Sequence, residues 1–397
     1  MAGLDETPKG GRVHIAFFGL RNAGKSTLVN AFTGQNLAIV SDVAGTTTDP
    51  VSKAMEILPL GPCLITDTAG LDDAGELGAM RVGKSLDVLA TADIAVWVSC
   101  GGGAEGGDAA EAAEALFRET CAKRGVAVLE YRRGDSVEEL KERIAAVKLA
   151  EVPRGLLDGM VAKGDRIVCV CPIDGSAPKG RLILPQVQLV RECLDAGAWC
   201  AVCQPAELPA VLACGAWKWV VTDSQAFGEV SATLERVCGG GAGRPERPRL
   251  TSFSILFARQ KGDLDEYAKG VEAIGSLRDG DTVLIAEGCT HRRQCNDIGT
   301  VKLPKALRRL TGRDLRFVFA SGNGFEIPAG AKLAVQCGGC MLTRRETLRR
   351  IEAAREAGVP IANYGMVLAA ASGIRVLPGS VEAVLAPAEG RGRGTDA

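Results

Sequence analysis

The sequence predicts an α/β protein of three domains, each built on a sheet of mainly parallel strands. Two observations lead to this fold class. Short apolar runs alternate along the chain with stretches of helical periodicity, an order typical of parallel sheets that are covered by helices. The chain is also 397 residues long, which is more than one hydrophobic core usually serves. We expect a first domain at 1–155 and two smaller ones at 156–243 and 244–397.

The alternation of expected strands and helices is clearest in the first domain and is also present in the other two. The elements expected in the first domain are strands at 13–18, 62–66, 94–99 and 126–129 and helices at 26–32, 111–123 and 137–147. Those expected in the second domain are strands at 166–170 and 217–221 and a helix at 185–194. The third domain is expected to hold strands at 282–286, 316–319 and 333–336 and helices at 264–276 and 344–357. The stretch 238–249 is too rich in Gly and Pro to continue either kind of element, so it marks a boundary.

Composition narrows the classes of function. The 47 basic and 48 acidic side chains give a formal net charge of −1, which offers no broad attraction to nucleic acid. The polar start of the chain and the lack of a long apolar run predict a cytoplasmic protein that does not enter a membrane. Its 14 cysteines should then be free, buried or metal-bound rather than paired in disulfides. With only two histidines, a site made of several imidazoles is excluded.

A phosphate-binding loop is the strongest single motif. Residues 19–26 read GLRNAGKS and fit G-x-x-x-x-G-K-[ST] between an expected strand and an expected helix. Backbone N–H groups of such a loop surround the β-phosphate, Lys25 reaches the β- and γ-phosphates, and the Ser26 hydroxyl binds Mg²⁺. The loop residues expected to contact the nucleotide are Gly19, Asn22, Ala23, Gly24, Lys25, Ser26 and Thr27.

Two further motifs follow in the order that a nucleotide hydrolase needs. Residues 67–70 read DTAG; Asp67 can hold Mg²⁺ through water, and Gly70 lets the backbone meet a γ-phosphate. We therefore expect Lys25, Asp67 and Gly70 to serve catalysis. Between the two motifs, GTTTD at 45–49 is a plausible switch loop in which Thr46 or Thr47 supplies a hydroxyl to Mg²⁺. By itself this loop is equally well an ordinary polar turn.

These three motifs together resemble the translation-factor-like GTPases related to TrmE and Era. The resemblance implies that Asn22 helps to coordinate K⁺. It also implies that Leu71, which follows DTAG, cannot orient a water molecule as the Gln of Ras does. GTP hydrolysis is therefore expected to be slow and stimulated by potassium.

The sequence departs from that family at the position that reads the base. The N-K-x-D motif is absent, and YRRGD at 131–135 stands in its place. Asp135 can still accept hydrogen bonds from guanine, or it can merely cap the helix that starts before Glu138 and Glu139. Selectivity for GTP is therefore left open by the sequence.

A second candidate site is made of cysteines. CTH at 289–291 and CGGC at 337–340 can bring three thiolates and one imidazole together. Their chemistry allows a structural zinc with three Cys and one His, or an iron–sulfur cluster that keeps one position exchangeable. Cys295 is the nearest competing thiol. In contrast, CAVC at 200–203 and the pair Cys169 and Cys171 lie in apolar surroundings and are interpreted as structural.

The combination of this cysteine pattern with the GTPase motifs resembles the HydF family, the GTPases that mature FeFe-hydrogenase. Further stretches similar to that family cover nearly the whole chain; they lie at 164–168, 172–188, 222–227, 250–259, 297–299 and 363–365. The resemblance implies a GTPase domain at 1–155, a dimerisation domain at 156–243 and an iron–sulfur cluster domain at 244–397.

What the resemblance implies for the cysteines is a 4Fe–4S cluster bound by Cys289, Cys337 and Cys340. His291 would be a labile fourth ligand or a group that supports the other ligands. Many relatives carry a His just before C-x-x-C where this chain has Gln336. This departure favours a fourth position that is open or filled by a carboxylate or water.

The implied role is that of a homodimeric scaffold and carrier. It would receive the diiron precursor from radical-SAM maturases and pass it to apo FeFe-hydrogenase, while GTP binding and hydrolysis to GDP bias its conformation or its affinity for partners. One alternative is a zinc-stabilised regulatory GTPase. The other is an RNA-associated GTPase of the Era or TrmE type, which the balanced charge and 4% aromatic content argue against.

Overall fold

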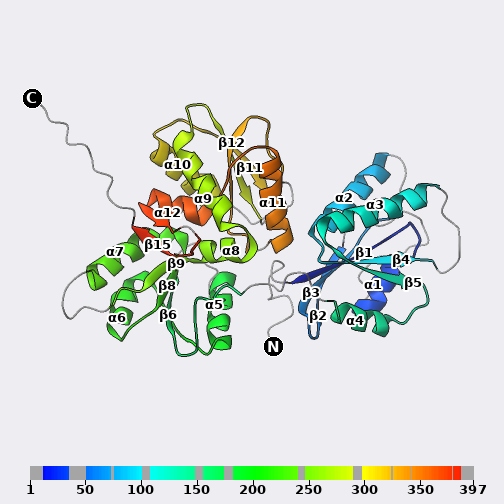
Figure 1. The fold of residues 1–397 in the computed structure, drawn as a ribbon, viewed down its shortest axis with the longest axis horizontal. Helices are drawn as coiled ribbons and strands as arrows, with labels where there is room; N and C mark the ends of the chain where they lie inside the picture. Colours follow the sequence, from blue (N-terminus) through cyan, green and yellow to red (C-terminus); the bar gives the residue numbers. More distant parts are fainter. Residues whose placement is uncertain are drawn as a thin grey trace, which may run out of the picture. The chain divides into compact units, whose positions relative to one another are not determined.

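The computed structural model divides into two compact units, Met1–Val152 and Pro153–Ala397 (Figure 1). The residues that the structure describes are 12–34, 51–72, 76–100, 108–147, 155–173, 182–239, 246–288, 297–322, 325–340, 342–377 and 379–385.

The first unit is a five-stranded sheet with helices on both faces. The strand order is β2-β3-β1-β4-β5, and only β2 runs antiparallel to its neighbour. The strands are β1 (Val13–Gly19), β2 (Val51–Ile57), β3 (Gly61–Asp67), β4 (Ile94–Ser99) and β5 (Ala127–Arg132). All seven residues of β1 are buried, because this strand is central and is covered on both sides.

The helices of this unit pack by their apolar stripes. One face of the sheet is covered by α1 (Lys25–Thr33) and α4 (Val137–Ala145), through residues such as Phe32 and Ile144. The other face is covered by α2 (Glu76–Thr91) and α3 (Asp108–Arg124), through Leu89 and Phe117. The α/β fold class that the sequence predicts is confirmed here.

The second unit contains two sheets. The six-stranded sheet has the order β14-β15-β9-β8-β6-β7, and the four-stranded sheet has the order β11-β10-β12-β13. The strands of the larger sheet are β6 (Arg166–Val170), β7 (Trp199–Cys203), β8 (Trp219–Thr222), β9 (Arg249–Ser252), β14 (Ile374–Val376) and β15 (Ala383–Leu385). Those of the smaller one are β10 (Thr282–Glu287), β11 (Arg316–Ser321), β12 (Ala331–Gln336) and β13 (Ile361–Asn363).

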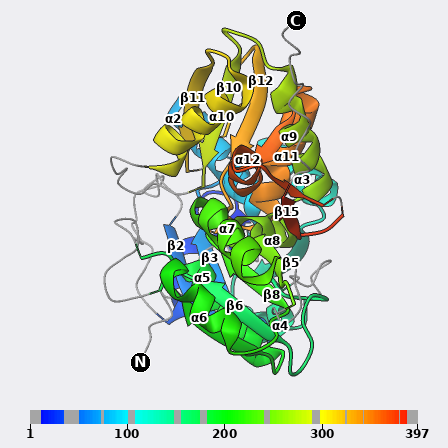
Figure 2. The ribbon, with the colours of Figure 1, turned by 90° about the vertical axis from the view of Figure 1, so that its left-hand side faces the viewer.

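Within the described ranges, eight α-helices accompany the two sheets of this unit. Along the larger sheet run α5 (Leu184–Asp195), α6 (Leu208–Ala213) and α7 (Phe227–Cys238) (Figure 2). The remaining helices are α8 (Phe253–Lys261), α9 (Leu264–Ala273), α10 (Leu303–Thr311), α11 (Arg344–Glu356) and α12 (Tyr364–Ala371).

Segments far apart in the sequence share the larger sheet. Strand β9 follows the Gly- and Pro-rich stretch and pairs in parallel with β8, and β15 then pairs with β9 in the antiparallel sense. The sheet is therefore mainly parallel, with an antiparallel edge that the sequence did not predict. The boundary expected between 243 and 244 stays a prediction, and strands from both sides of it lie in one sheet.

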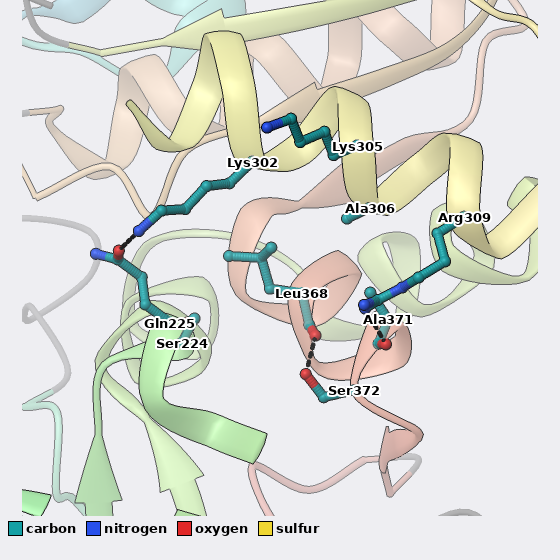
Figure 3. A pocket seen from close by; sticks show the side chains of 9 residues that line it. All are labelled: Ser224, Gln225, Lys302, Lys305, Ala306, Arg309, Leu368, Ala371 and Ser372. Atoms are coloured by element: carbon teal, nitrogen blue, oxygen red, sulfur yellow. Dashed lines mark hydrogen bonds between the residues drawn. The ribbon is translucent and has the colours of Figure 1, made fainter. Parts of the chain in front are cut away.

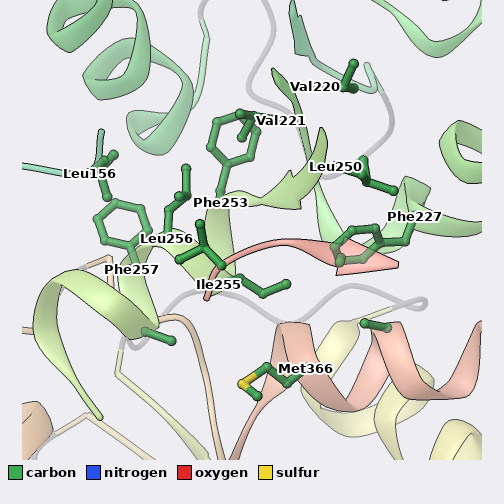
Figure 4. Packing of buried hydrophobic residues seen from close by; sticks show 14 of the residues in the cluster. Leu156, Val220, Val221, Phe227, Leu250, Phe253, Ile255, Leu256, Phe257 and Met366 are labelled. Carbon is green, nitrogen blue, oxygen red and sulfur yellow. The ribbon is translucent and has the colours of Figure 1, made fainter. Parts of the chain in front are cut away.

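Helix α8 lies where the six-stranded and the four-stranded sheets of the second unit meet. Its buried residues Phe253, Leu256 and Phe257 belong to one hydrophobic cluster that extends from Leu156 to Ala383. Figure 4 shows the three side chains of α8 with Leu156 and with Val221 of β8. This common core explains why the second half of the chain forms one compact unit.

Candidate functional site

The phosphate-binding loop follows β1 and leads directly into α1. Gly24 has a φ of 91° and Asn22 a φ of 61°, left-handed values that turn the chain sharply. A side chain at Gly19 would collide with the carbonyl group of Val98 on β4. The motif's glycines are therefore required by backbone conformation and by close packing.

Lys25 and Ser26 take the positions that the motif predicts. The Lys25 ammonium is folded over the loop and donates to the carbonyl oxygens of Leu20 at 2.7 Å and Gly19 at 3.3 Å. The Ser26 hydroxyl donates to Oδ2 of Asp67 at 2.6 Å. Two side chains that are distant in sequence and expected at Mg²⁺ are thus brought together.

Asp67 is fully buried. Burial raises the pKa of its carboxyl group above the ordinary value, and the Ser26 hydrogen bond and the Lys25 charge oppose that shift. Its Oδ1 atom has no hydrogen-bond partner among the described residues. A buried carboxylate oxygen beside a serine hydroxyl fits a hydrated Mg²⁺, which would satisfy it.

The DTAG segment is held against the phosphate-binding loop. A side chain at Gly70 would collide with the backbone of Arg21, whose N–H donates to Oδ1 of Asp72 at 2.5 Å. The Leu71 N–H donates to the carbonyl oxygen of Gly19 at 3.3 Å. Asp72 was not anticipated from the sequence, because nothing in the motif marks it as a partner of the loop. Thr46 and Thr47 lie outside the described residues.

Asp135 lies in the turn between β5 and α4. Its Oδ2 atom accepts from the Arg132 N–H at 2.8 Å. The side chain that caps α4 is Ser136, which accepts from the Glu139 N–H at 3.3 Å. The alternative that Asp135 caps this helix is therefore wrong. Its role in binding guanine stays a prediction.

The CGGC turn starts where β12 ends. Backbone pairing continues beyond the strand, because the Cys337 N–H donates to the carbonyl oxygen of Ala286 on β10 at 2.9 Å. The Gly288 N–H in turn donates to Sγ of Cys337 at 3.1 Å. The end of β10 and the first cysteine of the turn are thus in direct contact. Cys289, His291 and Cys295 lie outside the described residues, and no cluster of three or more metal-binding side chains occurs within the described ones.

Lys261 binds the backbone of the CGGC turn and of the residue that follows it closely, Leu342. Its ammonium donates to the carbonyl oxygens of Leu342 at 2.9 Å and Gly339 at 3.0 Å, with a longer contact to that of Cys340 at 3.4 Å. The side chain is 5% exposed. Burial lowers the pKa of Lys261 to about 8, and electrostatic interaction with Cys340 and Cys337 opposes this shift. Sequence reasoning missed this residue, which comes just after the family-like stretch 250–259.

A cavity of about 170 Å³ opens beside Cys337. Three carboxylates, Asp223, Glu287 and Asp297, are among the groups that line it, together with Tyr364. Glu287 is only 7% exposed. The cavity therefore offers oxygen donors on the side of the turn that Cys337 faces.

The two other cysteine pairs that the sequence singles out lie in or against the buried core. The sulfur atoms of Cys169 and Cys171 lie 3.5 Å apart in the buried core. Contact with Cys171 and burial both raise the pKa of the Cys169 thiol. Cys200 and Cys203 on β7 are half-buried and pack against the same core, in agreement with the interpretation of the sequence.

Three family models match successive parts of the chain. A model described as a 50S ribosome-binding GTPase matches residues 14–128. The hydrogen maturase F dimerization domain matches residues 156–262, and the hydrogen maturase F tetramerization domain matches residues 265–383.

Individual relatives resemble only a part of the chain. The tRNA modification GTPase MnmE of Endomicrobium trichonymphae is 40% identical over 88 residues, which are 22% of this chain and 19% of that protein. MnmE of Rhizorhabdus wittichii is 32% identical over 149 residues, which are 37% of this chain and 32% of that protein. The chain thus spans less than a third of either relative.

Among solved structures, Era of Aquifex aeolicus bound to GDP·AlF₄⁻ is 15% identical and covers 87% of this chain and 98% of its own, with a TM-score of 0.26. A score this low supports no conclusion about the chain. None of the helices in the described ranges is long and apolar enough to cross a membrane.

Proposed function

Since the chain belongs to the hydrogen maturase F family, we propose that it is a GTP-binding scaffold that assembles and delivers the diiron subcluster of FeFe-hydrogenase. Two family models that follow one another at 156–262 and 265–383 support this role. The partners of such a scaffold are the radical-SAM maturases that supply the precursor and the apo-hydrogenase that receives it. A second copy of the chain completes the proposed homodimer.

The first unit would bind GTP and hydrolyse it slowly to GDP and phosphate. Ser26 would hold Mg²⁺ directly and Asp67 would hold it through water, and the ion would supply positive charge beside the phosphates. Lys25 leaves its loop carbonyls to contact the β- and γ-phosphates. Leu71 is buried and has no polar group with which to orient the attacking water, so hydrolysis is slow. Asn22 helps to bind K⁺, which adds positive charge beside the phosphates.

The second unit would bind a 4Fe–4S cluster through Cys289, Cys337 and Cys340. The observation that carries this proposal is the hydrogen bond from the Gly288 N–H to Sγ of Cys337. This bond places Gly288, the residue that precedes Cys289 in the sequence, against the first cysteine of the CGGC turn. The fourth iron position, with His291, a carboxylate or water as its ligand, is then exchangeable, as a carrier requires.

A substitution that abolishes iron binding should leave GTP hydrolysis intact, and the reverse should also hold. After anaerobic reconstitution with iron and sulfide, the protein should show broad visible absorption and about four iron atoms per chain. Cys337→Ser should lose both signals and keep its GTPase, whereas Lys25→Ala should keep both signals and lose GTP hydrolysis. Hydrolysis by the unmodified protein should be faster in KCl than in NaCl.

Cys203→Ser is the matched control for the cluster, because Cys203 also belongs to a C-x-x-C pair. It should retain full iron content. A colourless protein that holds zinc instead of iron would establish the zinc-stabilised alternative. Equal hydrolysis rates in the two salts would remove the potassium site from the proposal.

A further inference from the structure

A second cavity of the second unit is lined by three cationic side chains. It has a volume of about 350 Å³ and lies between α10, α12 and the turn that precedes α7. Lys302, Lys305 and Arg309 project from the start and the exposed side of α10 (Figure 3). No acidic side chain belongs to its lining. This concentration is local, since the whole chain has a formal net charge of −1.

None of these three cations is neutralised by a carboxylate in the described part of the chain. Lys302 donates to Oε1 of Gln225, and Arg309 donates to the carbonyl oxygen of Ala371; both acceptors are neutral. Lys305 also lines the cavity, and its side chain runs along α10 with no hydrogen bond to another of the residues drawn in Figure 3. The cavity thus keeps three positive charges whose strongest possible partners, anionic oxygens, are missing from its walls.

Arg308 shows that the cations of α10 do not all lack a carboxylate partner. It is on the same helix but does not line the cavity. Its guanidinium pairs with Asp314 at 3.2 Å, donates to the carbonyl oxygen of Leu315 at 3.1 Å and lies over the ring of Phe317. The cations outside and inside the cavity therefore differ in whether the protein itself neutralises them.

A neutral amide adds donors beside the cations. Because the Gln225 amide directs its oxygen to Lys302, its two N–H donors are left for another acceptor. Ser224 and Ser372 also belong to the lining, but their hydroxyl groups already donate to Oγ of Ser252 and to the carbonyl oxygen of Leu368. The Gln225 amide is therefore the neutral donor of the site. Ala306 and Leu368 provide an apolar surface. Such a mixture of a few polar groups on an apolar base is typical of small-molecule sites, and the volume falls in their range.

We propose that this cavity binds a small multivalent anion that carries phosphate or carboxylate groups. Such a ligand would pair with Lys302, Lys305 and Arg309 at once. A metal cation would be repelled by the same charges, and a nucleic-acid strand needs a basic path longer than one cavity. The site is separate from the phosphate-binding loop. It shares Ser224, Gln225 and Leu368 with the cavity beside Cys337, so the anion would bind next to the cysteine site.

Calorimetric titration of the full chain with pyrophosphate and with citrate tests this site. Saturating Mg·GDP is present throughout, so that the phosphate-binding loop is already occupied. We expect one saturable site per chain, and the comparison of the two probes identifies the preferred anionic group. Lys305→Ala should weaken binding by about tenfold or more, as expected for a charge-assisted hydrogen bond. Lys305→Arg should retain most of the affinity.

Arg308→Ala is the matched control, since it removes the same charge from the same helix outside the cavity. It should leave the affinity within about twofold, because its charge is already paired. The absence of saturable binding for both probes would overturn the proposal. Equal losses in Lys305→Ala and Arg308→Ala would overturn it too, because diffuse attraction and not a built site would then explain the binding.

Discussion

The contacts of Lys261 define the geometry of the CGGC turn. Taking this ammonium out of water costs on the order of 3 kcal/mol, judged from its lowered pKa. Each carbonyl bond that would be left unmade costs about 1–3 kcal/mol. The two effects nearly cancel in stability, so the main consequence of Lys261 is the shape of the turn.

Lys261→Met should therefore change the turn more than the stability of the protein. Met keeps the apolar stem but cannot bind the carbonyl groups of Gly339 and Leu342, so the turn should loosen. We expect lower iron content after reconstitution and faster alkylation of Cys337 and Cys340 in the metal-free protein. Lys269→Met is the control, since this lysine is exposed and its ion pair within the described part of the chain is with Glu266. Unchanged iron content and alkylation would show that the turn holds its shape without Lys261.

Residues that act within a motif could be placed from the sequence. Lys25 and Ser26 begin α1 and Asp67 ends β3, and Ser26 meets Asp67 as expected; their roles at the nucleotide stay a prediction. Lys261 and Asp72 could not be predicted in this way. Lys261 contacts a turn 78 positions further along the chain, and Asp72 contacts the phosphate-binding loop across 51 positions. Contacts between residues so far apart in the sequence depend on the tertiary fold, which the local sequence pattern does not reveal.

Helix α9 packs very closely against strand β13. Its Gly270 lies against β13, where a side chain would collide with the carbonyl oxygen of Ile361. The helix can approach the strand only because this position has no Cβ atom. Gly275, just beyond the end of the helix, has open space around its Cα atom.

Gly270→Ala should destabilise the second unit although alanine favours helices. The added methyl group must push α9 away from β13, at a cost of about 1–3 kcal/mol. The midpoint of urea unfolding, followed by far-ultraviolet circular dichroism, should fall. Gly275→Ala should leave it nearly unchanged, and equal midpoints for the two variants would argue against close packing of the helix.

A clear apolar pattern made elements predictable from the sequence, whereas length alone did not, since helix α2 with its 16 residues was not predicted. Every strand and helix predicted for the first domain is present, with ends shifted by a few residues. The strands β13, β14 and β15 have three residues each, too few to show a periodicity. Strand β2 was also missed, because its first six residues are exposed or half-buried and form no apolar run.

At the scale of the whole molecule, the two units have separate cores. The hydrophobic clusters of the first unit contain described residues from Val13 to Val147, and those of the second contain residues from Leu156 to Ala383. No cluster of the described residues includes members of both units. The units should therefore unfold as two cooperative blocks.

Calorimetry should resolve two thermal transitions, of which only one responds to nucleotide. With Mg·GDP at about 100 times its Kd, the first unit gains about 2.7 kcal/mol, which raises its transition by roughly 5–10 °C. The transition of the second unit should not move. Lys25→Ala should abolish the shift, and a single transition, or two that rise together, would show that the units are coupled.

The pairing of β15 with β9 also determines when the larger sheet can be completed during synthesis on the ribosome. The first unit can fold as soon as its own residues have emerged. One edge of β9, in contrast, finds its partner only after β15 has been made. Until then a newly made chain exposes an unpaired strand edge, which is a template for aggregation. The order of synthesis thus allows the larger sheet to be completed only after all four strands of the smaller sheet have been made.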